Sequence, residues 1–225
     1  MRLGATVLAA GFLLAACSSG SSGGTKADPA ADQKSAASIN IKQSDFPAGW
    51  EGSPPSKNNT AATGEVARLF SCIGIQDPAK DQSAQAFSDT FSQGGQSTAS
   101  SQVRFTQKAS DASTDFKAIA GPKTPGCIEQ TFQQAVSTLI PANAGATFTG
   151  LKVDKRTVPK ANGVNAAGYR ATLTVTVAGQ QIPVTADLAF VQKGRAEGTV
   201  SFIGPVRAVP DDVQTQVITA FEKRM

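Results

Sequence analysis

Apolar and polar residues alternate strictly in the C-terminal half of the chain. In 168–178, Ala, Leu and Val alternate with Arg and Thr, and 182–192 alternates in the same way. A period of two is typical of strands that bury one face and leave the other in water. Short Gly-containing turns separate the segments, so the pattern predicts an antiparallel meander with a Thr-rich solvent face. Its four strands are expected at 148–158, 168–178, 182–192 and 196–203.

Other segments show helical spacing or further strand patterns. Apolar residues recur three and four positions apart, which indicates helices with one buried face. Because strands and helices do not alternate singly, the order predicts an α+β fold. We expect a twisted antiparallel sheet of about six strands, packed against helices on its apolar face. The remaining elements are helices at 59–74, 110–120, 125–140 and from Asp211 onward, and a hairpin of 86–91 and 97–107 around Gly94-Gly95.

The segment Asp45–Trp50 is rich in turn-forming Pro and Gly. We expect Phe46 and Trp50 to fix it to the domain. Trp50, the only Trp, is interpreted as a packing anchor, with a binding platform as the alternative.

The N-terminus has the pattern of an export signal. Arg2 precedes an uncharged apolar run over 3–14. That run is too short to cross a bilayer core, which takes about 20 residues. We therefore expect 1–16 to be a signal peptide that is removed.

The residues at the end of this run resemble the lipobox of bacterial lipoproteins. Leu14, Ala15 and Ala16 supply one aliphatic and two small residues directly before Cys17. The resemblance implies that the Cys17 thiol receives a diacylglyceryl group and becomes the new N-terminus. Two acyl chains hold a protein on a membrane durably. The alternative is an ordinary secretory signal with Cys17 present by accident.

Residues 17–38 contain no aromatic residue and no aliphatic residue larger than Ala. Such a Gly/Ser/Ala-rich segment buries too little surface to offset its ordering entropy, so it is expected to be a disordered tether. Residues 39–225 then form one globular domain. The expected location is the extracytoplasmic face of a cell membrane.

Two cysteines, Cys72 and Cys127, remain after Cys17 is assigned to the lipid. Disulfides form and persist outside the cytoplasm, and two thiols allow one intramolecular pairing. We expect a Cys72–Cys127 disulfide, with two separate buried thiols as the alternative. Two Cys without His make a poor zinc set, so neither a metal nor another cofactor is expected.

The composition restricts the chemistry. The chain has no His, which excludes Ser-His-Asp and Cys-His catalysis. The 21 Lys and Arg against 17 Asp and Glu are scattered, so no nucleic-acid partner is expected. Asp187 and Glu197 fall on neighbouring predicted strands, and we expect both on the solvent face rather than in a carboxylate pair. Other candidate carboxylates are Asp45, Glu51, Glu65, Asp77, Asp81 and Asp89.

The whole layout resembles small actinobacterial envelope lipoproteins. The shared features are the lipobox, the tether, the Asp45–Trp50 segment, the paired Cys and the meander. The layout is also similar to extracellular sensor domains of mycobacterial-type receptor kinases and to Mog1/PsbP-like domains. The resemblance implies a twisted antiparallel sheet with helices. That sensor group uses two disulfides and this chain can make one. No functional residue carries over, because these groups share no site motif.

These features favour a non-catalytic binding or sensing module of the cell envelope. Its ligand would be a lipid-like or other envelope molecule, and some of the twelve Phe would line an apolar cavity. The alternatives are a structural or adaptor lipoprotein that acts through protein contacts and a hydrolase that uses carboxylates.

Replacing the lipobox cysteine tests the anchor. Cys17→Ser removes the thiol that would carry the lipid, so we expect the protein to leave the membrane fraction for the soluble fraction. Immunoblots of fractionated cells measure this, with Ser18→Ala as the control. Persistence of the Cys17→Ser chain in membranes would contradict the lipoprotein assignment.

Overall fold

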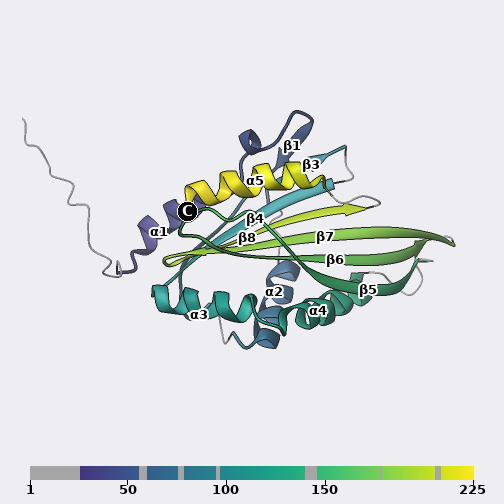
Figure 1. Ribbon diagram of the computed structural model, residues 1–225, viewed down its shortest axis with the longest axis horizontal. Helices are drawn as coiled ribbons and strands as arrows, with labels where there is room; N and C mark the ends of the chain where they lie inside the picture. Colours follow the sequence, from purple (N-terminus) through teal and green to yellow (C-terminus); the bar gives the residue numbers. More distant parts are fainter. Residues whose placement is uncertain are drawn as a thin grey trace, which may run out of the picture.

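The computed structural model describes residues 26–55, 60–75, 79–94, 97–139, 146–177, 179–205 and 209–225. Within these residues the chain forms one antiparallel sheet between two layers of helices (Figure 1). The strands are β1 (Trp50–Ser53), β2 (Gln82–Phe87), β3 (Thr90–Gln93), β4 (Ser97–Thr106), β5 (Ala146–Arg156), β6 (Asn165–Val177), β7 (Gln180–Lys193) and β8 (Ala196–Pro205). The helices are α1 (Pro29–Ile39), the short η1 (Gln43–Asp45), α2 (Thr60–Ile73), α3 (Ala109–Ile119), α4 (Thr124–Leu139) and α5 (Asp211–Arg224).

The predicted meander is confirmed. Strands β5, β6, β7 and β8 pair in sequence order, and β8 then pairs with β4. Gly179 and Gly194 lie in the connecting turns with φ of 80° and 58°, a conformation that favours glycine. The α+β class is confirmed as well. The sheet has eight strands in the described residues, in the order β1-β3-β4-β8-β7-β6-β5 with β2 also beside β4, rather than about six.

The additional strands come from the first half of the chain. The expected strand 86–91 is interrupted at Ser88 and Asp89, so β2 and β3 pair one after the other with successive parts of β4. Strand β1 was not predicted. It pairs with β3, and Trp50 at its start is 3% exposed and stacks on Phe46 with ring centroids 4.7 Å apart. The interpretation of Trp50 as a packing anchor is confirmed.

Helices cover both faces of the sheet, so the expectation of helices on one face alone is wrong. On one side α1 and α5 pack on the sheet, and on the other side α2, α3 and α4 do (Figure 1). The central strands are apolar on both faces. In β7, for example, Leu188 and Phe190 face the α2–α3–α4 layer, while Ala189 and Val191 face α5. The predicted polar face persists at the outer part of β6, where Thr172 is exposed.

Helix α1 corrects the expected tether. Pro29–Ile39 lies within the region predicted to be disordered, 17–38, yet it is a helix with Asp28 as its N-cap. Ala36 and Ile39 are buried against the sheet. Asp32 binds Arg195 through two short contacts of 2.6 and 2.8 Å, and this hydrogen bonding lowers the pKa of Asp32. The ordered domain therefore includes α1, while the signal peptide and Cys17 lie outside the described residues.

The predicted disulfide is confirmed. Cys72, near the end of α2, is bonded to Cys127, in the first turn of α4. The cysteines are 55 residues apart in sequence, and closing a loop of that length stabilises the fold by about 4 kcal/mol in the chain-entropy model. The disulfide thus ties together two helices of one layer. In the described part of the chain, no helix is both long and apolar enough to cross a membrane.

The contact between β8 and α5 generates a prediction. A Cβ added at Gly198 would lie 2.5 Å from ring atoms of Phe221, which is fully buried. We expect Gly198→Ala to lower the free energy of unfolding by about 2–3 kcal/mol, as overpacking of a core does. Urea titration measures the change.

The matched control is Gly126→Ala in α4, where an added Cβ meets no atom within 4 Å. That variant should be as stable as the wild type or more stable by up to ~1 kcal/mol, because Ala favours helix over Gly. Equal stability of both variants would contradict the packing argument.

Candidate functional site

A cavity of about 340 Å³ lies between the sheet and the α2–α3–α4 layer. Its walls are mainly aliphatic and aromatic side chains from all three helices and from β7. Five of the twelve phenylalanines line it, so the apolar cavity considered from the sequence is present. The apolar wall residues include Leu69 and Phe70 of α2, Phe116 and Ile119 of α3, Ile128 and Phe132 of α4, and Leu188 and Phe190 of β7.

The cavity floor carries a row of polar side chains. Alternate residues of a strand face the same side, so Ser100, Gln102 and Arg104 of β4 lie on the cavity face. Their cross-strand partners on β8 are Ser201, Thr199 and Glu197, in that order. We call these six residues the polar stripe.

The two ends of the stripe differ. At one end the hydroxyls of Ser100 and Ser201 are hydrogen-bonded at 2.9 Å. Ile203 lies beyond Ser201 on β8, and Phe87 of β2 lies beside Gln102; they are 42% and 45% exposed and also line the cavity. These are the large hydrophobic side chains exposed in the described residues. We call the side of the cavity lined by these two exposed residues its mouth, and the Arg104–Glu197 end of the stripe lies under α3.

The inner end holds a buried charged cluster. Arg104 donates to Asp115 of α3 at 2.5 Å, and its Nε lies 2.6 Å from Glu197 Oε2. Its guanidinium carbon is 4.9 Å from the centre of the Phe70 ring, a cation–π contact. The Arg104 guanidinium thus forms ion pairs with two carboxylates.

Glu197 is the most perturbed acid of this cluster. Burial raises its pKa from 4.5 to about 7, and the neighbouring Asp115 adds to the shift while Arg104 opposes it. Burial also raises the pKa of Asp115. No described residue makes a well-aligned hydrogen bond to either Glu197 oxygen, although Oε2 is close to Arg104. Glu197 is therefore a buried carboxyl whose hydrogen-bonding capacity is largely unused.

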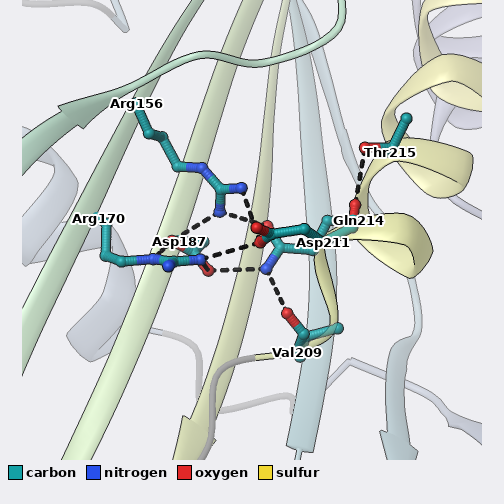
Figure 2. A network of polar contacts seen from close by, with 7 residues as sticks. All are labelled: Arg156, Arg170, Asp187, Val209, Asp211, Gln214 and Thr215. Carbon is teal, nitrogen blue, oxygen red and sulfur yellow. Dashed lines mark hydrogen bonds and ion pairs between the residues drawn. The ribbon is translucent and has the colours of Figure 1, made fainter.

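The opposite face of the sheet holds a second polar network, beneath the start of α5 (Figure 2). Arg170 binds Asp187 through two contacts of 2.6 and 2.9 Å, and Gln214 donates to the same carboxylate at 2.7 Å. Arg156 contacts Asp187 and Asp211 at 2.8 and 3.0 Å. These contacts outweigh burial, so the pKa of Asp187 is lowered. The network fastens α5 to strands β5, β6 and β7.

The expectation that Asp187 and Glu197 lie on the solvent face is wrong. Both are buried, at 2% and 7% exposure, because the sheet is covered on both sides. They also face opposite layers, since Asp187 contacts α5 and Glu197 contacts Arg104 below α3. They therefore form no catalytic pair.

The other candidate carboxylates do not converge either. Asp45 is buried and bound to Arg224 at 2.6 Å, and Glu51, Asp81 and Asp89 are exposed. Asp77 and the side chain of Glu65 lie outside the described residues. In the part of the chain that the structure describes, no group of three or more His, Cys, Asp or Glu side chains is placed to hold a metal ion.

Sequence reasoning missed Arg104, Gln102 and Thr199 as site residues. They form one site because β4 and β8, which are far apart in the sequence, are neighbours in the sheet. The sequence did offer one signal of this site. Each of the two strands carries a charged residue, Arg104 or Glu197, at a position that faces inward.

These features define an α+β domain with an amphiphilic cavity. No protein-family model and no curated protein matches the chain. Among solved structures it is similar to the extracellular domain of PknH from Mycobacterium tuberculosis, at 9% identity and a TM-score of 0.40 over 78% of this chain and 81% of that chain. It is also similar to LpqN, described as involved in cell envelope biogenesis of Mycobacterium tuberculosis, at 12% identity and a TM-score of 0.30 over 78% of this chain and 74% of that chain.

The raised pKa of Glu197 predicts a pH dependence of stability. Because the folded-state pKa exceeds 4.5, the native state keeps a proton that the unfolded state releases. This stabilisation is complete below about pH 4.5 and is lost as the pH rises to about 7. We expect the wild type to lose up to about 3 kcal/mol over this range relative to Glu197→Gln, which cannot ionise.

Urea unfolding at pH 4.5 and pH 8 measures the difference between the two chains. The control is Glu51→Gln, which changes an exposed carboxyl in the same way. Parallel stability profiles for the wild type and Glu197→Gln would show that Glu197 is ionised in the folded state throughout.

Proposed function

We propose that this chain is an exported lipoprotein, anchored through Cys17, whose domain binds an apolar or amphiphilic envelope molecule without transforming it. The observation that carries the proposal is the cavity of about 340 Å³ with apolar walls and a polar stripe. Ligand sites are commonly apolar cavities of about 300–1,000 Å³ with a few polar groups that orient the ligand.

The apolar walls support a ligand with a hydrocarbon part. Burying one methylene contributes about 0.8 kcal/mol, so an eight-carbon chain would gain about 6 kcal/mol before the costs of association. The mouth, lined by Phe87 and Ile203, gives such a chain an apolar point of entry.

The described polar groups support binding rather than catalysis. Asp187 is held by two arginines and a glutamine away from the cavity. In the cavity, Glu197 and Asp115 share Arg104, and the sequence has no His to act as a general base. The described serine hydroxyls of the cavity bond to one another or to backbone and amide oxygens, so none of them is paired with a base as nucleophilic catalysis requires.

The adaptor alternative receives less support from the surface. A continuous exposed apolar patch would favour docking of a protein. The exposed large hydrophobic side chains of the described residues, Phe87 and Ile203, belong to the cavity mouth instead.

Native mass spectrometry of residues 18–225, exported by an actinobacterial host, tests the proposal, since this chain includes every described residue. We expect an added mass that organic solvent removes. Thr199→Phe places a ring in the cavity and should abolish the added mass. Thr172→Phe makes the same change at an exposed position of β6 and should retain it.

A bare protein mass would contradict the proposal if the same chain also failed to bind added 1-octanol in calorimetry. Crosslinking to protein partners would then be the next measurement. Thermal melts of both variants confirm that each is folded before its mass is compared with that of the wild type.

A further inference from the structure

Three oxygen-bearing side chains line the cavity toward the inner end of the polar stripe, and one of them, Glu197, holds a buried acceptor without a hydrogen-bond partner. Thr199 follows Glu197 by two residues and faces the same side of β8, and Gln102 is the cross-strand partner of Thr199. Directly opposite side chains in an antiparallel pair have Cβ atoms about 5 Å apart. Within the described chain, nothing donates a hydrogen bond to Thr199 Oγ1 or Gln102 Oε1, and Glu197 Oε1 is likewise unpartnered. The three side chains thus line the same part of the cavity.

The charge around these oxygens is unbalanced. Among the described residues, Arg104 is the one cation in contact with Glu197 and Asp115, and Asp111 and Asp81 add further negative potential at Asp115. The residues of α2, α4 and β7 that line the cavity carry no charge. With both carboxyls ionised, the cluster is therefore one positive charge short.

We propose that the cavity selects apolar ligands that carry a primary amine, whose ammonium group donates hydrogen bonds to Glu197, Thr199 and Gln102. This inference rests on the proposed function and specifies the ligand's polar group. An ammonium has three donors and no acceptor, which matches three acceptor oxygens and supplies the missing charge. A hydroxyl has one donor and brings no charge. A carboxylate or phosphate would be repelled by the two acidic side chains.

Burial makes this pairing selective. Glu197 is 7% exposed, and both of its oxygens are shielded from water. A charge-assisted hydrogen bond is stronger than a neutral one, and low local polarity strengthens it further. The same burial raises the pKa of Glu197 to about 7, so at pH 8 the carboxylate is the main form and can accept the ammonium.

Three probes with hydrocarbon parts of the same length distinguish the contribution of the head group to binding from that of the hydrocarbon part. Calorimetric titration of residues 18–225 with octylammonium, 1-octanol and octanoate at pH 8 compares a cation, a neutral donor and an anion. We expect octylammonium to bind at least about tenfold more tightly than 1-octanol, and octanoate to bind more weakly than either.

Three variants assign the effect to the named side chains. Glu197→Gln keeps the shape and removes the charge, so octylammonium should lose its tenfold advantage while 1-octanol binds as before. Thr199→Val removes one acceptor and should reduce octylammonium affinity several-fold. Thr172→Val, the same change at an exposed site on β6, should leave all three affinities unchanged.

The outcomes separate this inference from the proposed function. Equal binding of octylammonium and 1-octanol would overturn the amine selectivity and leave an apolar binding cavity. An advantage for octylammonium that survives in Glu197→Gln would overturn the assignment to Glu197. No binding of any octyl probe would overturn both proposals.

Discussion

The pairing of β4 with β8 is the contact on which both the core under α1 and α5 and the cavity depend. The two strands are paired from Thr98–Ile203 to Phe105–Ala196 and bring the first half of the chain into the sheet of the second half. On one face they bury Val103, Val200 and Phe202 under α1 and α5. On the other face the same strands present the polar stripe. A one-residue shift in this register would exchange the two faces, so the core packing and the site specify the register together.

Polar groups inside this domain fall into two kinds. Beneath α5, around Asp187, donors and acceptors are matched, and the network joins three strands to a helix (Figure 2). Removing one member of such a buried network leaves a charge without compensation, which is strongly destabilising. Around Glu197, by contrast, acceptors outnumber donors. Buried polar groups are normally satisfied, and this local excess of acceptors is the observation on which the proposed binding of an amine rests.

Local sequence pattern was sufficient where an element depends on local contacts. The strands β5 to β8 and the helices α3, α4 and α5 follow from their periodicity, and the disulfide follows from a count of thiols. Helix α1 was missed, because its small residues form a stable helix only when Ala36 and Ile39 pack on the sheet and Asp32 meets Arg195. The second helix layer and the polar stripe of the cavity were missed for a related reason. Both depend on which strands are neighbours, and alternation within a single strand does not contain that information.

The Cys72–Cys127 disulfide has a consequence for the cavity. It joins α2 to α4, and Leu69, Phe70, Ile128 and Phe132 of these helices are cavity walls. The α1–α5 layer contains no such covalent link in the described residues. A reducing environment would therefore loosen the walls of the binding cavity and leave the helices on the other face packed as before. On the proposed function, ligand binding would thus depend on formation of this disulfide, which an exported chain would acquire outside the cytoplasm.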